Sequence, residues 1–174
     1  MIKKHYYSWT DVENMCVNIV NQMYKDHWRP DYIVGITRGG NVPATIISNM
    51  TGIRCEALKV SLRDDDSQSE SNTWMAEDAL GYPHSDTNDN KKKILIVDDI
   101  NDTGETLLWI QKDWRTAHYP GDDRWDNIWG DNVRVAVIHN NTPSNFSNVT
   151  YVASTINKTE NPVWIVYPWE KSNV

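Results

Sequence analysis

The stretch that decides the fold is residues 94–107, which read ILIVDDINDTGETL. Its first four residues are all apolar, which is typical of a central strand in a parallel sheet, buried on both faces. Asp98 and Asp99 end the apolar run, and Thr103-Gly104-Glu105-Thr106 then opens a helix that we expect over residues 105–114. Strand, acidic turn and helix therefore form one β-α unit.

Strands and helices alternate on both sides of this unit. We expect strands at residues 32–36, 54–60, 93–98, 133–139 and 150–153, and two further helices at 11–27 and 42–50. The run Thr10-Asp11-Val12-Glu13 predicts a capping box for the first helix, and Gly52 closes the second. The alternation predicts an α/β fold, a mostly parallel twisted sheet flanked by helices on both sides (Rossmann-like).

Length and charge restrict the class of protein. The chain has 174 residues, 24 of them acidic and 17 basic, for a net charge of −7. This length fits a single domain spanning residues 1–174, and the acidic balance argues against a nucleic-acid partner. No apolar run approaches the roughly 20 residues of a membrane span, so we expect no membrane partner either. Cys16 and Cys55 are interpreted as reduced thiols, which favours a cytoplasmic location.

Residues 61–92 interrupt the alternation with a long polar and acidic stretch. Loops of that length inside a compact domain are usually functional lids or disordered segments. We interpret residues 61–92 as a lid at the same edge of the sheet as the acidic turn.

The acidic turn combines features that suit one class of ligand. A helix N-terminus holds a phosphate through free N–H groups, and Gly104 lets the backbone come close to it. The nearby carboxylates would repel a bare phosphate, but they suit hydroxyl groups, Mg²⁺ or a carbon that becomes cationic during reaction. A phosphorylated sugar with a cationic transition state meets all of these demands. Neither a GxxxxGK[ST] nor a GxGxxG motif is present.

The run 97–106, VDDINDTGET, resembles the 5-phosphoribosyl-1-pyrophosphate (PRPP) motif of type I phosphoribosyltransferases. Residues 35–40, GITRGG, resemble that family's pyrophosphate loop, and residues 164–170, WIVYPWE, resemble the base-covering hood of its xanthine–guanine–hypoxanthine branch. The hood is expected over about residues 150–174. The resemblance spans residues 32–170 and implies a PRPP-dependent glycosyltransferase of purine salvage.

The resemblance also implies residue roles in binding PRPP. The turn of Thr103, Gly104, Glu105 and Thr106 would hold the 5′-phosphate, with Glu105 contributing its backbone N–H. Asp98 and Asp99 would hold the ribose hydroxyls directly or through Mg²⁺, with Asp99 and Glu170 as the metal ligands. The pyrophosphate loop would be Thr37, Arg38, Gly39 and Gly40, in which a strained peptide bond is common in the family. Asp102 would bind beside N7 of the purine as the general base.

The base pocket departs from the family pattern. Purine enzymes of this branch carry a lysine after the strand equivalent to residues 133–138, where it donates to the 6-oxo group. The aligned residue here is Asn141, whose amide can donate to an oxygen or accept from an amino group, so adenine stays open as a substrate. Trp164 would stack on the base, and the backbone near Ile165 would read its 2-position.

The expected reaction transfers ribose 5-phosphate from PRPP to a purine base and yields pyrophosphate and a purine nucleoside monophosphate. Two alternatives remain open from the sequence. The acceptor could be adenine, orotate or uracil, or the chain could be a non-catalytic regulator that senses PRPP. Family members are commonly oligomers, so we expect a homodimer.

Overall fold

The computed structural model describes residues 1–60, 72–82 and 90–170. Its main sheet has five strands in the order β3-β2-β4-β5-β6. They are β2 (Tyr32–Thr37), β3 (Cys55–Lys59), β4 (Ile94–Asn101), β5 (Val133–Asn141) and β6 (Tyr151–Ile156). Each neighbouring pair is parallel, so the expected mostly parallel sheet is parallel throughout its described strands. The α/β fold predicted from the sequence is thereby confirmed.

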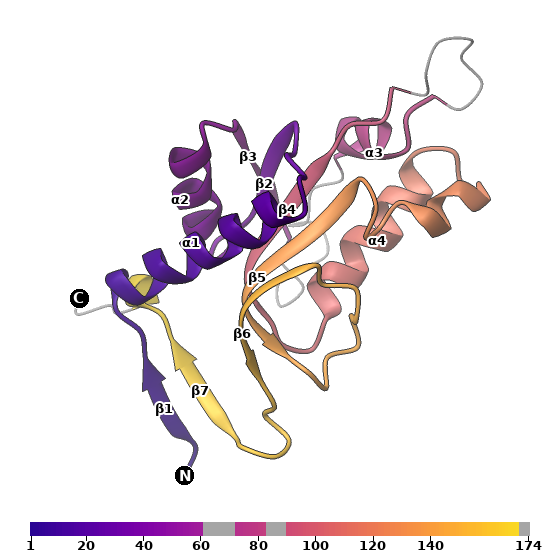
Figure 1. The fold of residues 1–174 in the computed structure, drawn as a ribbon. Helices are drawn as coiled ribbons and strands as arrows, with labels where there is room; N and C mark the ends of the chain where they lie inside the picture. The colour runs from indigo at the N-terminus through magenta and orange to yellow at the C-terminus, as the bar shows by residue number, and fades with distance from the viewer. Residues whose placement is uncertain (61–71, 83–89, 171–174) are drawn as a thin grey trace.

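Helices cover both faces of this sheet (Figure 1). Helices α1 (Trp9–Lys25) and α2 (Asn41–Thr51) pack on one face, and α3 (Thr73–Leu80) and α4 (Glu105–Ala117) pack on the other. Two short 3₁₀ helices, η2 (Asp123–Asn127) and η3 (Pro168–Glu170), complete the described elements. None of the helices described is long and apolar enough to cross a membrane.

The core is split by the sheet into two clusters, and alternate residues of the central strands enter different clusters. In β4, Ile94 and Ile96 pack with α3 and α4, whereas Leu95 and Val97 pack with α1 and α2. All four side chains are fully buried. This two-sided burial explains the unbroken apolar run at the start of β4.

The capping box of α1 differs from the sequence expectation. The N-cap is Ser8, whose Oγ accepts a hydrogen bond from the Asp11 N–H at 3.0 Å, and the Asp11 carboxylate accepts one from the Ser8 N–H at 2.8 Å. The predicted box at Thr10 and Glu13 was wrong by two residues, because Asp11 can serve at N3 as Glu does. The predicted end of α2 is confirmed: Gly52 has a left-handed φ of 74°, and its N–H donates to the Ser48 carbonyl.

Residues 61–92 contain an element that the sequence analysis did not expect. Helix α3 occupies residues 73–80 and buries Met75, Ala76, Ala79 and Leu80 in the core. The expectation of one long lid is therefore wrong for this middle part, which is structural. The rest of the predicted lid falls mainly on residues 61–71 and 83–89, which lie outside the described residues.

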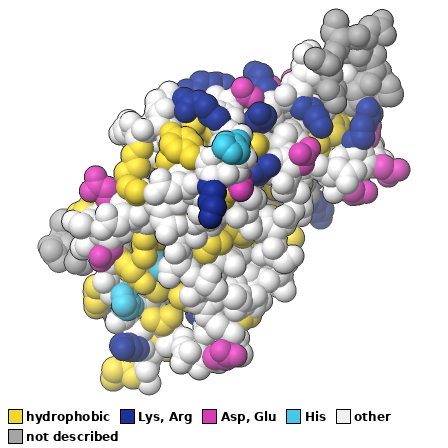
Figure 2. All heavy atoms as spheres, in the orientation of Figure 1, with side chains coloured by type: hydrophobic (Ala, Val, Ile, Leu, Met, Phe, Trp, Pro, Cys, Tyr) yellow, Lys and Arg dark blue, Asp and Glu magenta, His cyan; other side chains and the backbone are white. Residues whose placement is uncertain are grey.

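The C-terminal hood is built from both ends of the described chain. Strand β1 (Lys3–Tyr6) pairs in parallel with β7 (Val163–Val166), and the Tyr7 N–H donates to the Val166 carbonyl at 2.9 Å. In Figure 1 this pair projects from the end of the molecule toward which the β6 arrow points. Residues 151–156, expected within the hood, form β6 of the main sheet instead. Hydrophobic side chains gather over this β1–β7 end in Figure 2, where Ile2, Tyr6 and Trp164 are exposed.

Candidate active site

A cavity of about 870 Å³ opens at the carboxyl ends of β2, β3 and β4. Its walls include the predicted pyrophosphate loop, the paired acids and the predicted phosphate turn. The lining residues are Ile36, Thr37, Arg38, Gly39, Lys59, Val60, Asp98, Asp99, Ile100, Asn101, Asp102, Thr103, Gly104, Glu105, Thr106 and Leu107. Of the residues predicted to bind PRPP, all but Gly40 line this cavity.

The loop after β2 lies directly against the end of β4. A Cβ on Gly39 would lie 2.1 Å from Oδ2 of Asp99, and one on Gly40 would lie 2.5 Å from the Val97 carbonyl oxygen. Glycine therefore allows the loop to pack this closely against β4. Gly40 contacts the β4 backbone and does not line the cavity. The Thr37–Arg38 peptide bond is cis. The close contact between Gly39 and Asp99 places the Asp99 carboxylate and the loop that carries Arg38 on one wall of the cavity.

The paired acids, Asp98 and Asp99, are half-buried carboxylates that line the cavity. The Asp99 N–H donates to Asp98 Oδ1 at 2.9 Å, and the Ile100 N–H donates to Asp99 Oδ1 at 2.8 Å. Burial and the neighbouring charge of Asp99 raise the pKa of Asp98 well above its ordinary value, and burial also raises the pKa of Asp99. Two adjacent acids held in this way suit a ligand that brings hydroxyl groups or positive charge.

The turn before α4 is an open helix N-terminus. Gly104 is its N-cap with a left-handed φ of 88°, and this N-cap residue has no side chain with which to cap the helix. The Glu105 N–H lies 3.3 Å from Thr103 Oγ1, and the Thr103 carbonyl accepts from the Asn145 N–H at 3.0 Å. Helix amides and hydroxyl groups around the cavity are the elements of a phosphate site.

Asn101 stabilises the position of this turn through side-chain hydrogen bonds. This role was not identified from the sequence. Asn101 Nδ2 donates to Asn140 Oδ1 at 2.8 Å and to the Phe146 carbonyl at 2.9 Å, while its Oδ1 accepts from Ser144 Oγ at 2.8 Å. This network ties the end of β4 to the segment between β5 and β6. Lys59 and Val60 were also missed, although their place at the carboxyl end of β3, at the same sheet edge, was a usable signal.

Asp102, the predicted general base, has a cationic partner. Lys158 Nζ lies 2.8 Å from Asp102 Oδ2. Asn141 touches both residues: its Nδ2 donates to the Asp102 carbonyl at 3.1 Å and to Oδ1 at 3.3 Å, and its Oδ1 accepts from the Lys158 N–H at 2.9 Å. The structure thus brings the predicted residues Asp102 and Asn141 together, and it adds a lysine that the sequence analysis did not identify.

The remaining predicted site residues lie away from the cavity walls. Trp164 is 57% exposed on β7, and Ile165 is buried in the core on the α1 and α2 side of the sheet. Glu170 is exposed, and its Oε2 accepts from the Tyr167 N–H at 2.9 Å. Tyr167 connects the hood to the acids, because its hydroxyl donates to the Asp99 carbonyl at 3.0 Å.

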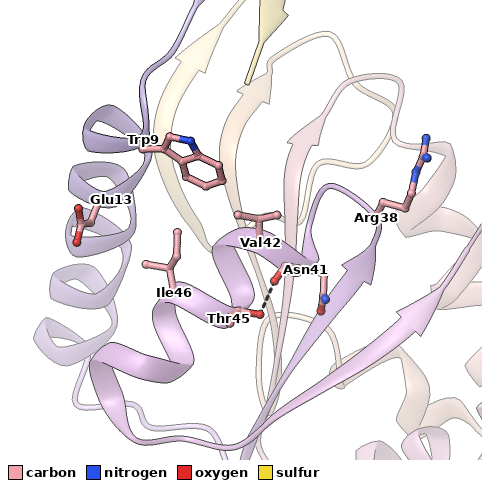
Figure 3. Close-up of a pocket in the computed structure, with 7 residues that line it drawn as sticks. All are labelled: Trp9, Glu13, Arg38, Asn41, Val42, Thr45 and Ile46. Carbon is pink, nitrogen blue, oxygen red and sulfur yellow. Dashed lines mark hydrogen bonds between the residues drawn. The ribbon is translucent and has the colours of Figure 1, made fainter. Parts of the chain in front are cut away.

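A second cavity, of about 450 Å³, lies between α1 and α2 (Figure 3). Its lining includes Trp9, Val42 and Ile46, and Arg38 is shared with the first cavity. In Figure 3 the Arg38 side chain extends away from Trp9 and Ile46. The second cavity therefore offers an apolar wall, whereas the first offers backbone amides and carboxylates, and we place the chemistry in the first.

Comparison with known proteins identifies the family. Residues 2–120 match the family model of the phosphoribosyl transferase domain. The match covers more than half of the chain, and the chain belongs to the phosphoribosyltransferase family, whose enzymes are PRPP-dependent glycosyltransferases. The resemblance found in the sequence is thereby confirmed.

Individual relatives extend the match along the chain. Xanthine phosphoribosyltransferase 1 of Saccharomyces cerevisiae is 25% identical over a 197-residue alignment that covers 99% of this chain and 92% of the relative. A xanthine-guanine phosphoribosyltransferase of Cereibacter sphaeroides is 33% identical over 96 residues, covering 53% of this chain and 51% of the relative. The crystal structure of a purine phosphoribosyltransferase from Pyrococcus horikoshii has the same fold, with a TM-score of 0.67, 22% identity, and coverage of 99% of this chain and 98% of that one.

Proposed function

We propose that this chain is a purine phosphoribosyltransferase that transfers ribose 5-phosphate from PRPP to a ring nitrogen of xanthine, guanine or hypoxanthine. The products are pyrophosphate and a purine nucleoside monophosphate, as in purine salvage. The observation that carries the proposal is one cavity that holds the glycine-capped N-terminus of α4, two half-buried acids and the Arg38 loop. The names of the yeast and bacterial relatives support the choice of a purine.

Each part of the cavity has a role in this reaction. The amides of residues 104–106 hold the 5′-phosphate at the positive end of the α4 dipole. The Arg38 guanidinium donates to the departing pyrophosphate, which carries negative charge. Asp98 and Asp99 bind the ribose hydroxyls and stabilise the positive charge that develops at the anomeric carbon. Asp102 accepts the proton from N7 of the purine.

The donor set fits Mg²⁺. Proteins hold this ion through one or two carboxylates, while substrate phosphates complete its shell of oxygen ligands. Burial raises the pKa values of Asp98 and Asp99, and the charge of Asp99 raises that of Asp98 further, so a bound divalent cation would stabilise the ionised forms. Asp99 would hold the ion, because its carboxylate lies against the Arg38 loop. The ion would supply charge neutralisation of the pyrophosphate. Glu170 stays a predicted second ligand.

The proposal is tested by pyrophosphate release. The protein is mixed with Mg²⁺, PRPP and one of xanthine, guanine, hypoxanthine or adenine, and turnover is expected with at least one 6-oxopurine. Asp102→Asn should lower kcat by about 10²–10⁴-fold, the usual contribution of a general base. Asp131→Asn is the matched control, because Asp131 is an exposed carboxylate in the segment before β5, outside the cavity lining. Chelation of Mg²⁺ should stop turnover.

Two outcomes would contradict the proposal. Pyrophosphate release with none of the bases, combined with calorimetric binding of PRPP, would favour a PRPP-sensing protein. Full activity of the Asp102→Asn variant would remove Asp102 from the reaction. The cytoplasmic location and the homodimer stay predictions from the family resemblance, and light scattering coupled to size exclusion measures the assembly directly.

A further inference from the structure

The ion pair between Lys158 and Asp102 joins two segments that are 56 residues apart in the sequence. Strands β4, β5 and β6 are neighbours in a parallel sheet, so the segments that follow them meet at one edge. Asp102 follows β4, and Lys158 follows β6. The order of the strands in the sheet therefore explains how Lys158, in the segment after β6, reaches the predicted general base Asp102.

The position of Lys158 is held by its backbone. Its N–H donates to Asn141 Oδ1 at 2.9 Å, and the nearby Thr142 N–H donates to the Ile156 carbonyl at 2.9 Å. The Lys158 side chain is 25% exposed and the Asp102 side chain 45% exposed, so a ligand at this edge can reach both. The ammonium group is thus presented beside the carboxylate from an anchored loop.

Asn141 is occupied by these contacts. Its Nδ2 donates to Asp102 and its Oδ1 accepts from Lys158, so both ends of the amide bind within the protein. Asn141, which aligns with the family's base-reading lysine, therefore connects the segments that carry Asp102 and Lys158. The positive charge at this edge comes from Lys158.

The edge of a purine that carries N7 also carries the 6-substituent. Guanine and other 6-oxopurines present an acceptor at position 6, whereas adenine presents an amino donor there. An ammonium group only donates hydrogen bonds. A carboxylate facing N7 with an ammonium 2.8 Å from it matches the 6-oxo edge, whereas opposite adenine the ammonium donor would face the amino donor at position 6.

We propose that Lys158 is the specificity-determining residue that donates to the 6-oxo group of the purine and selects 6-oxopurines over adenine. This inference rests on the proposed function, because it places the N7 edge against Asp102. A purely structural ion pair at this level of exposure contributes little to stability, so the two roles predict different results.

The experiment compares hypoxanthine with adenine in pyrophosphate release by the wild type, Lys158→Met and Lys158→Arg. Lys158→Met should lower kcat/KM for hypoxanthine by about 10- to 100-fold through KM for the base, with KM for PRPP unchanged. The hypoxanthine-to-adenine ratio should fall by a similar factor, and Lys158→Arg should retain most of it. Lys112→Met, which removes an exposed lysine on α4, is the matched control and should behave as the wild type.

A binding measurement separates this inference from the proposed function. Calorimetry should show tighter binding of inosine monophosphate than of adenosine monophosphate, and Lys158→Met should remove that preference. An inactive wild type that still shows this Lys158-dependent preference would overturn the enzyme proposal and support the inference. A Lys158→Met protein that keeps the wild-type preference in binding or in turnover would overturn the inference.

Discussion

At the residue scale, glycine decides how closely the turn before α4 packs against the segment between β5 and β6. Gly104 combines a left-handed φ of 88° with tight surroundings, because a Cβ there would lie 2.5 Å from the Phe146 nitrogen and 2.7 Å from Ser144 Oγ. Gly52 has a similar φ of 74°, yet a Cβ there would meet nothing within 4 Å. The two glycines therefore separate the cost of a left-handed backbone from the cost of crowding.

Gly104→Ala should destabilise the protein more than Gly52→Ala. The left-handed conformation costs roughly 1–2 kcal/mol at either position. Crowding against Phe146 and Ser144 should add about 1–3 kcal/mol at Gly104 alone. Urea unfolding measures the difference, and KM for PRPP should rise only in Gly104→Ala because only that turn belongs to the site. Equal losses in both variants would show that the turn relaxes freely.

The position of the acidic turn in the cavity wall was predictable from the sequence, whereas the hydrogen-bond and ion-pair partners of its residues were not. Asp98, Asp99 and the residues of the phosphate turn are contiguous, so one motif identifies them. Lys158 reaches Asp102 through the order of strands in the sheet, which a local pattern does not encode. For the same reason, the sequence could predict Asn141 as a base-binding residue but could not show that its amide is already bonded on both sides.

At the element scale, a buried histidine connects the hood to the sheet. His139 on β5 is fully buried, and its Nδ1 lies 2.7 Å from the Tyr167 hydroxyl, which itself donates to the Asp99 carbonyl. Because that hydroxyl proton is used, Nδ1–H is the donor to Tyr167. Nε2 has no hydrogen-bond partner among the described residues, so a proton on it would be buried and unsatisfied. Burial accordingly lowers the pKa of His139 to about 4.

Acidification should therefore weaken the fold through His139. Its pKa is about 4 in the folded protein, compared with an ordinary 6.5, so the stability it contributes is present above pH 6.5 and is lost as the pH falls toward 4. The free energy of unfolding should fall by about 2 kcal/mol between pH 7 and pH 5 through this group. Urea unfolding of His139→Gln should show a smaller fall, whereas His27→Asn, which removes an exposed imidazole far along the chain from His139, should keep it. Parallel pH profiles for wild type and His139→Gln would contradict this assignment.

Elements differed in how far the sequence revealed them. Strand β4 was predicted correctly, because its burial on both faces requires a run of apolar residues that is visible in the sequence. Strand β1 has four exposed residues, Lys3–Tyr6, and becomes a strand only because β7 lies beside it. Helix α3 is flanked by polar residues, so its short apolar face was hidden inside a stretch expected to be a lid.

At the scale of the whole molecule, the two adjacent acids of the site lower the stability of the fold at neutral pH. Asp98 and Asp99 are adjacent carboxylates in buried surroundings, and their raised pKa values mean that the folded protein holds the charged forms less favourably than the unfolded chain does. The associated stability is present below the ordinary pKa of aspartate and is lost as the pH rises through the raised values. At neutral pH without a cation, the pair therefore costs folding free energy.

Asp98→Asn should stabilise the protein and inactivate it. Removing one of the two charges should raise the free energy of unfolding by about 0.5–2 kcal/mol at pH 7, while the amide oxygen can still accept from the Asp99 N–H. Thermal unfolding should show a higher Tm for Asp98→Asn than for wild type without ligand. With Mg²⁺ and PRPP added, the Tm of the wild type should rise and that of the variant should change less. A lower Tm for unliganded Asp98→Asn would contradict this reading.

The pairing of β1 with β7 joins segments that are 160 residues apart in the sequence, since Lys3 pairs with Val163. All five strands of the main sheet lie between them in the chain. Pairing over such a separation requires a long loop to close, which makes long-range strand pairing slow. The β1–β7 pair should therefore form after the shorter-range pairs of the main sheet, so the hood is the last part of the fold to be completed.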